Sequence, residues 1–410
     1  MSRSAARSPW LVVLLGFAAI VFDGYDLIVY GSSVPALLAQ PGWDLSPAEV
    51  GAIGSYALLG MLVGAIASGW LTDRFGRRRV FVGCLAWFSV MMLGAALAPG
   101  PELLGVFRFL AGLGFGGIAP TAIALVVEVA PVARRNLLNA VMLAGFPVGG
   151  VLAAILAVGL LEPYGFRLLF GLGVLPLVTL VPLALWLLPE SPQFTRARTR
   201  TAGVLRGGVA TSALLFAVAN FCGFLLVFGL NTWLPQLMRL AGYNLGSALG
   251  FLLALNVGGV LGGLAGSGLS DRFGARWVAT VLFVVAAGSL ALLAVPLPTV
   301  LVYLVVTLAG AASVGNQIVV YGYVATHYPA AVRATALGFT SGIGRLGAAA
   351  GPLLGGLLVA AGFGLGMNVS VFAAVAVLGA FAAALVPRPS LQAVSAIETT
   401  PAQRPLPEAA

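Results

Sequence analysis

Two aspartates interrupt an otherwise apolar stretch near the beginning of the chain. Asp23 and Asp26 are the only charged residues between Trp10 and Leu38, a segment long enough to cross a bilayer, which takes about 20 apolar residues. Their spacing places both carboxylates on one face of a helix. Each carboxylate at membrane depth costs about 2.5–3.5 kcal/mol on insertion scales. The pair therefore indicates either proton transfer or a buried ion pair.

Arg108 is the basic residue expected at the same depth as this pair. With a rise of ~1.5 Å per residue, Asp26 lies ~6 Å and Arg108 ~9 Å below the same face of a ~30 Å hydrocarbon core. We therefore predict that Arg108 pairs with Asp26, Asp23 or both. One interpretation is proton coupling, in which moving the arginine changes the affinity of an aspartate for a proton. The other is a static pair that fixes two helices, and two neighbouring carboxylates would titrate together.

Arg345 is a second arginine expected inside the membrane, ~16 Å from the start of its helix. No acidic residue occurs between Asp271 and Glu398, so the sequence offers it no nearby partner. A guanidinium can hold a carboxylate through two parallel hydrogen bonds. We predict that Arg345 binds an anionic substrate. The alternative is a bond to backbone carbonyls or to a carboxylate from the other half of the chain.

Amide and aromatic side chains at similar depth are candidates for the wall of a substrate site. Amides in membrane spans are costly unless hydrogen-bonded, so they either meet hydroxyls on a substrate ring or bridge helices. Most aromatic residues on membrane helices simply pack. The predicted substrate-binding residues besides Arg345 are Tyr25, Phe115, Asn220, Phe224, Asn316, Gln317 and Tyr321, and Tyr30, Phe221, Trp233 and Phe339 lie at comparable depth.

The composition explains why these charges stand out. The chain has 410 residues, of which 60% are hydrophobic and 8% are charged, whereas soluble domains carry about 25% charged residues. This predicts an all-α integral membrane protein. The net charge of +9 comes from arginines in loops on one side, with only Arg167 and Arg239 on the other. Short arginine-rich loops stay cytoplasmic, so both termini are expected in the cytoplasm, with contact to membrane lipids rather than nucleic acid.

Twelve apolar spans can be traced along the chain. A polar, arginine-rich loop at 189–209 divides them six and six, which predicts an N-terminal bundle over 1–188, a C-terminal bundle over 210–387 and a disordered cytoplasmic tail over 388–410. The spans are expected at 10–38, 48–72, 79–98, 102–128, 137–161, 166–188, 210–238, 246–269, 277–296, 298–326, 335–361 and 367–387.

An internal repeat relates the two halves. Thr72-Asp73-Arg74-Phe75-Gly76 follows the second span and Ser270-Asp271-Arg272-Phe273-Gly274 follows the eighth, at an offset of 198 residues. Pro131 and Arg135 match Pro329 and Arg333 at the same offset. Parallel repeats of this kind enclose a substrate site between the halves, near mid-membrane.

Charged residues on the arginine-rich side predict a cytoplasmic gate that is closed by ion pairs. The alternative is that they only set topology and solvate the surface. In the second half Ala275-Arg276 replaces the run Arg77-Arg78-Arg79, so the two halves are not expected to gate equally. The predicted gate residues are Asp73, Arg74, Arg77, Glu128, Arg134, Arg135, Asp271, Arg272 and Arg333.

Three motifs resemble those of the major facilitator superfamily. They are the loop 69–79, the segment 108–117 beginning Arg108-Phe109-Leu110, and Pro189-Glu190-Ser191-Pro192. Asp23-Gly24-Tyr25-Asp26 is similar to the aromatic acid:proton symporter branch, as are the segments 231–235 and 242–248. The resemblance implies twelve helices in two six-helix bundles and uptake of a benzoate-like carboxylate with a proton, by alternating access, across an inner membrane.

Other functions remain open. Proton-driven efflux is one, although the antiporter pattern Gly-Pro-x-x-Gly-Gly occurs at 351–356, in the eleventh span, and not in the fifth. A non-aromatic organic acid, a sugar or nitrate is also possible as substrate. The sequence offers no His/Cys cluster, nucleotide loop or triad, so we expect no enzyme activity, cofactor or metal. The expected partners are a small anionic substrate, protons and lipids, and the protein is expected to be a monomer.

Overall fold

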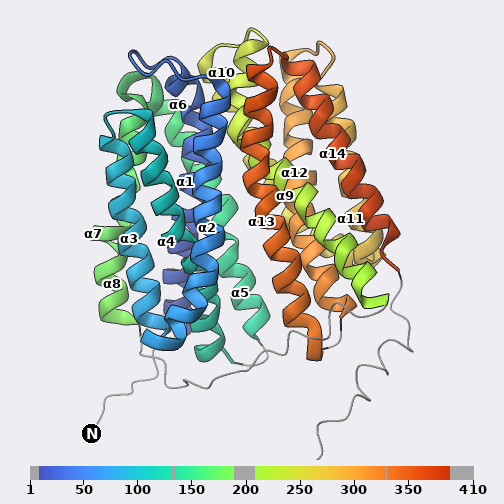
Figure 1. The fold of residues 1–410 in the computed structure, drawn as a ribbon. Helices are drawn as coiled ribbons and strands as arrows, with labels where there is room; N and C mark the ends of the chain where they lie inside the picture. The colour runs from blue at the N-terminus through green and yellow to red at the C-terminus, as the bar shows by residue number, and fades with distance from the viewer. Residues whose placement is uncertain (1–8, 132–133, 189–207, 329, 388–410) are drawn as a thin grey trace, which may run out of the picture.

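The computed structural model describes residues 9–131, 134–188, 208–328 and 330–387, and within these the regular structure is helical throughout. Figure 1 shows the helices in two groups that lie side by side, the first half in blue to green and the second in yellow to red. The first half contains α1 (Pro9–Leu38), α2 (Pro47–Phe75), α3 (Arg77–Leu97), α4 (Pro101–Val129), α5 (Arg135–Leu143), α6 (Gly145–Leu172), α7 (Leu175–Val178) and α8 (Leu180–Leu187). The second contains α9 (Gly208–Leu240), α10 (Leu245–Phe273), α11 (Ala275–Leu292), α12 (Thr299–His327), α13 (Ala330–Ala360) and α14 (Leu365–Leu385).

Eleven helices among the described residues are long and apolar enough to cross a membrane. The expected sixth span, 166–188, is not one continuous helix. It consists of the end of α6 beyond Gly165, whose φ is 74°, followed by α7 and α8. Pro176 and Pro182 each lack the N–H that an uninterrupted helix would use, which favours the breaks. The expected fifth span is divided at Ala144, between α5 and α6. The predicted linker and tail lie almost entirely outside the described residues.

The repeat extends to helix bounds and to single hydrogen bonds. α2 and α10 each have 29 residues, and so do α4 and α12, in both cases at the 198-residue offset. α2 is followed by Gly76 with φ 85° and α10 by Gly274 with φ 87°, a conformation that favours glycine. Arg135 Nε donates to the Ala130 carbonyl at 3.2 Å, and Arg333 Nε donates to the Tyr328 carbonyl at 3.3 Å. The two halves therefore share local structure as well as sequence.

Glycine permits close packing of matching helix pairs within each half. Gly60 of α2 lies against the backbone of α4, and Gly112 of α4 lies against that of α2. In the second half Gly258 of α10 and Gly310 of α12 make the same contacts at the repeat offset. Any side chain at these positions would collide with a main-chain carbonyl. Small residues of this kind let membrane helices approach closely.

The halves contact each other at the end of the bundle where α2 begins and α13 ends, which we call the closed end. Every residue of α1 from Asp23 to Pro35 is buried, and so is every residue of α9 from 225 to 235. Gly31 of α1 lies against the backbone of Asn231 in α9. Ser55 of α2 donates to the Ala349 carbonyl of α13 at 2.6 Å. α1, α2, α9 and α13 are thus the central helices. The opposite end, where α2 and α10 end, is the arginine-rich end.

Candidate transport site

Arg108 and Asp26 form a buried ion pair between α4 and α1. The Arg108 Nη1 atom donates to Asp26 Oδ1, and each side chain is 1% exposed. The guanidinium also lies over the ring of Tyr30, with its central carbon 4.9 Å from the ring centroid, and 5.8 Å from that of Phe170. Cation–π contacts of this kind strengthen when water is excluded. The pairing predicted from helix depth is confirmed, and the structure selects Asp26 as the partner.

The ion pair belongs to one half of the molecule. α1 and α4 both come from the N-terminal half, so the pair does not bridge the two bundles. Asp26 Oδ2 and Arg108 Nε find no hydrogen-bond partner among the described residues. Losing either partner would strand the other as a buried charge, which typically costs 3–5 kcal/mol.

Asp23 lies one turn away in a different electrostatic environment. Its side chain is buried and its Oδ1 atom has no hydrogen-bond partner in the described part of the chain. The charged groups that act on it are Arg345 of α13 and Asp26 of its own helix. Between the aspartates, Gly24 brings α1 directly against the backbone of Phe146 in α6. Asp26 therefore pairs within its own half, whereas the arginine that acts electrostatically on Asp23 belongs to the other half.

Arg345 is positioned by α13 at the boundary between the halves. It is half-buried, and its Nη1 atom donates to the Met61 carbonyl of α2 at 3.4 Å. This distance is beyond the usual 2.7–3.2 Å, so the bond is weak. A guanidinium carries five N–H donors. Arg345 thus makes a weak contact with the backbone of Met61 and interacts electrostatically with the carboxylate of Asp23. Both partners belong to the N-terminal half. They correspond to the two alternatives to substrate binding that the sequence left open.

Two aromatic rings stand beside Arg345. Tyr321 of α12 meets Phe224 of α9 edge to face, with centroids 6.2 Å apart. The Tyr321 hydroxyl donates to Ser341 Oγ of α13 at 3.2 Å, and Arg345 acts on Tyr321 electrostatically. Gly344 lies directly against the Phe224 ring. Ser341 was missed by the sequence reasoning, although its position one turn before Arg345 on the same helix could have signalled it.

The three predicted amides occupy α9 and α12. Asn220 and Asn316 are fully buried and Gln317 is 8% exposed. Gln317 lies against Gly223 of α9, and Asn220 packs at Gly344 of α13. Neither the oxygen nor the nitrogen of any of the three amides has a hydrogen-bond partner among the residues that the structure describes. The second half therefore places two unsatisfied amides, those of Asn220 and Gln317, next to the ring pair and Arg345.

Two predicted substrate residues lie elsewhere. The Tyr25 hydroxyl donates to the Leu169 carbonyl of α6 at 2.8 Å. Phe115 stacks on Phe88 of α3 with centroids 4.4 Å apart. Both side chains are used in packing the N-terminal half, and the structure does not bring them to Arg345. Tyr30 and Trp233 are similarly engaged, donating to the carbonyls of Val50 and Pro352.

The predicted gate residues surround the arginine-rich end. Arg77 of α3 forms an ion pair with Glu128 of α4. Arg74 lies over the Trp70 ring and Arg272 over the Phe273 ring. The backbone bonds of Arg135 and Arg333 were given above, and Asp73, Arg134 and Asp271 are exposed. Each of these contacts lies within one half, so a gate at this end stays a prediction.

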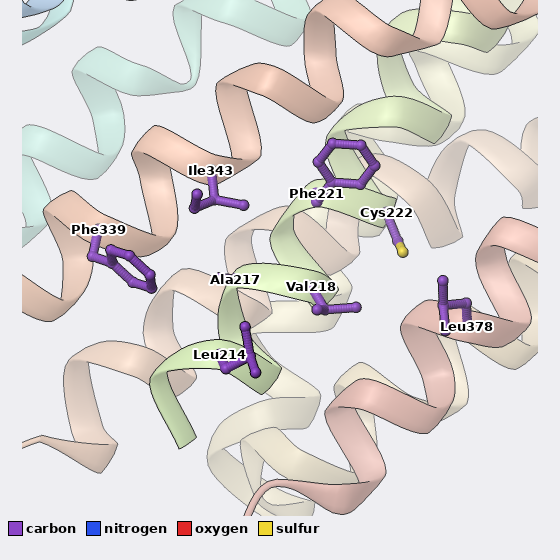
Figure 2. Close-up of a pocket in the computed structure, with 8 residues that line it drawn as sticks. All are labelled: Leu214, Ala217, Val218, Phe221, Cys222, Phe339, Ile343 and Leu378. Carbon is purple, nitrogen blue, oxygen red and sulfur yellow. The ribbon is translucent and has the colours of Figure 1, made fainter. Parts of the chain in front are cut away.

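A separate apolar cavity of about 330 Å³ lies among α9, α13 and α14 (Figure 2). Its lining offers no charged group to hold a carboxylate, and it includes two aromatic residues noted for their depth, Phe221 and Phe339. The lining residues are Leu214, Ala217, Val218, Phe221, Cys222, Phe339, Ile343 and Leu378. Among the described residues no group of three or more His, Cys, Asp or Glu side chains could hold a metal ion.

The sequence profile of the Major Facilitator Superfamily matches residues 16–268 and 248–408. The chain belongs to this superfamily. Members of the superfamily are transporters, so the protein is a multi-pass membrane transporter and not an enzyme. The all-helical fold with two related halves is the fold of this superfamily.

Relatives within the superfamily carry aromatic acids. The chain is 39% identical to the gentisate transporter of Corynebacterium glutamicum over 382 residues, covering 90% of this chain and 86% of the relative. It is 34% identical to the benzoate transport protein of Acinetobacter baylyi over 391 residues, covering 85% and 83%. It is 31% identical to the 4-hydroxybenzoate transporter PcaK of Pseudomonas putida over 401 residues, covering 88% of each.

Solved structures show the same fold at lower sequence identity. The crystal structure of a D-xylose-proton symporter matches with a TM-score of 0.79 at 17% identity, covering 93% of this chain and 98% of the symporter. The inward open conformation of the xylose transporter XylE from E. coli matches with a TM-score of 0.76 at 17% identity, covering 95% and 100%. At this identity the likeness establishes the fold alone.

Proposed function

We propose that this transporter takes up a small aromatic carboxylate together with protons, by alternating access across the inner membrane. The names of the gentisate, benzoate and 4-hydroxybenzoate relatives support the substrate class. Proton coupling is supported by buried carboxylates in the membrane, which typically mark proton pathways.

The position of Arg345 is the observation that carries the proposal. Its guanidinium is half-buried, makes a long bond to the Met61 carbonyl as its one hydrogen bond among the described residues, and stands next to the Phe224–Tyr321 ring pair. A carboxylate can replace that weak bond with two charge-assisted hydrogen bonds. The ring of the substrate then lies against aromatic side chains, which favour offset or edge-to-face contact.

The two aspartates have distinct roles in this proposal. The Asp26–Arg108 pair is internal to the N-terminal half, so it persists when the halves rock as rigid bodies. Asp23 interacts with Arg345 of the other half, so the same movement changes its surroundings. A carboxylate whose cationic neighbour approaches and leaves changes its affinity for a proton. Asp23 is therefore the residue that exchanges the coupled proton, and Asp26 with Arg108 keeps α1 fixed on α4.

The orientation follows from the arginine-rich end. Short loops rich in arginine stay in the cytoplasm, so this end and both termini are proposed to be cytoplasmic. The closed end then faces outward, and its contacts, such as Gly31 on Asn231, seal the outer side. The gate proposed at the cytoplasmic side includes the Arg77–Glu128 pair and closes when the outer side opens. The transporter works as a monomer surrounded by lipid.

Uptake into proteoliposomes tests this function. Labelled benzoate, hydroxybenzoates, gentisate, shikimate and a sugar are supplied with and without an inward proton gradient. We expect accumulation of at least one aromatic acid only when the gradient is present. Arg345→Gln should abolish it, while Arg276→Gln, which changes an arginine bonded to the Ala384 carbonyl outside the site, serves as the matched control. Sugar uptake without aromatic acid uptake, or proton-driven export, would contradict the proposal.

A further inference from the structure

Three buried amide side chains of the second half have no hydrogen-bond partner among the described residues, which calls for a physical explanation. Asn220, Asn316 and Gln317 together leave three carbonyl oxygens and three NH₂ groups without a partner among the described residues, and none is exposed. A buried polar group without a hydrogen bond is costly, and such groups in native proteins are rare. Asn139, Gln236 and Asn368 each leave only an oxygen without a partner, whereas these three amides leave both atoms, and two of them, Asn220 and Gln317, pack at the site.

Other buried amides of this chain show what helix bridging looks like. Asn256 donates to Asn231 Oδ1 and to the Leu252 carbonyl, each at 2.9 Å. Asn231 donates to the Val227 carbonyl at 2.7 Å, and Asn368 donates to the carbonyls of Phe363 and Gly364. The protein thus satisfies the NH₂ groups of the buried amides that join or cap its helices. Asn220, Asn316 and Gln317 make no such bonds within the part of the chain that the structure describes.

Helix register places one of these amides opposite Arg345. The Tyr321–Ser341 hydrogen bond links α12 and α13, which run in opposite directions. One turn from each partner toward the closed end is Gln317 on α12 and Arg345 on α13, both ~6 Å along their helices. Gln317 and Arg345 therefore lie at the same level on two facing helices.

α9 supplies the side of the site between them. Gly223 brings its backbone against Gln317, and the ring of Phe224 lies at Gly344, next to Arg345. Asn220, one turn from Phe224 on the same helix, also reaches Gly344. An aromatic ring held at Phe224 would have the guanidinium at one edge and amides at the other.

We propose that Gln317 and Asn220 bind a hydroxyl group on the substrate ring, so that the transporter selects hydroxylated aromatic carboxylates over unsubstituted ones. The proposal rests on the proposed function, in which Arg345 takes the carboxylate. An amide both donates and accepts, as a hydroxyl does, and it carries no charge, which suits a neutral substituent better than a second carboxylate. Sites built to hydrogen-bond a hydroxyl reject analogues that lack it.

The wild-type protein gives the first test. The kcat/KM for proton-driven uptake of 4-hydroxybenzoate, 3-hydroxybenzoate, gentisate and benzoate is measured in proteoliposomes. We expect the best hydroxylated acid to exceed benzoate by about tenfold or more, because unsatisfied amides disfavour the unsubstituted ring. Comparable values for benzoate and every hydroxylated acid would overturn the proposal while leaving aromatic acid uptake intact. No uptake of any aromatic acid would remove the proposed function itself.

Two variants then assign the selectivity. Gln317→Met and Asn220→Leu keep similar volumes and remove the hydrogen-bonding groups. In each, kcat/KM for the preferred hydroxylated acid should fall about tenfold more than that for benzoate. Asn368→Leu, which changes a buried amide of α14 bonded to the two carbonyls just before that helix, is the matched control and should leave the ratio as in the wild type. If both site variants lowered the two substrates by equal factors, the amides would serve packing and the proposal would be wrong. If a variant does not fold, the wild-type ratio of kcat/KM for the hydroxylated acid to kcat/KM for benzoate still tests the proposal.

Discussion

Asp26 accepts a hydrogen bond from Arg108 within the same half of the protein, while Asp23, three residues earlier, interacts with Arg345 of the other half. One turn of helix thus carries two carboxylates, one with its arginine neighbour in the same half and one with its arginine neighbour in the half that moves relative to it. A contact inside a rigid bundle persists through rocking, whereas the separation of two groups in different bundles changes. This difference separates a positioning pair from a residue that senses the state of the transporter.

Asp26→Asn should destabilise the protein. The substitution leaves the Arg108 guanidinium buried without its counter-charge, and breaking a buried pair in this way costs about 3–5 kcal/mol. Thermal unfolding in detergent should show a lowered midpoint, and transport should fall with it. The double variant Asp26→Asn/Arg108→Gln, which removes both charges, should recover part of the lost stability. An unchanged unfolding midpoint together with full transport by Asp26→Asn would show that the pair does not hold α1 on α4.

Asp23→Asn should separate exchange from accumulation. The variant keeps the size of the side chain and cannot release a proton, so the two halves can still rock with substrate bound. We expect counterflow of labelled substrate across proteoliposomes to continue while accumulation driven by an inward proton gradient is lost. Asp44→Asn, at an exposed loop position, is the control and should retain both activities. Retained gradient-driven accumulation in Asp23→Asn would move the coupling elsewhere.

Arg345→Lys tests the geometry of anion binding. Lysine keeps the positive charge and loses the planar fork that can hold a carboxylate through two hydrogen bonds. We expect the KM for the transported acid to rise roughly tenfold or more, with a smaller change in kcat. Substrate-dependent quenching of tryptophan fluorescence gives an independent Kd. An unchanged affinity in both measurements would show that the fork of Arg345 does not hold the carboxylate.

The sequence was most informative about features that depend on the cost of burying one charged residue or on the number of residues between two positions. The cost of charge in the membrane singled out Asp26 and Arg108, and helix rise alone matched their depths. The repeat offset predicted equivalent helices, and it holds down to the backbone bonds of Arg135 and Arg333. These features follow from composition, length and covalent spacing, which a sequence states directly.

Helix rotation could not be predicted in the same way. α1 is buried on every side from Asp23 to Pro35, so its apolar pattern does not say which face meets the site. Tyr25 consequently turned out to bond α6, and Phe115 to stack on Phe88. The breaks at Gly173 and Thr179, inside the expected sixth span, were also missed, because glycine and proline are tolerated in membrane helices when neighbours satisfy the freed backbone groups.

Gly31→Ala should shift the transporter away from the arrangement described here. A Cβ atom at this position collides with the Asn231 carbonyl, so α1 and α9 must separate at the closed end. Spin labels at Ala39 and Ala361, exposed positions in opposite halves at that end, report the separation by pulsed electron–electron double resonance. The labels are introduced in a variant that lacks the two native cysteines. We expect a longer distance population and slower net uptake. Gly159→Ala, at a helix glycine with open space around it, is the matched control and should leave the distances as they were. If Gly31→Ala also left them unchanged, close contact between α1 and α9 would not determine closure of this end.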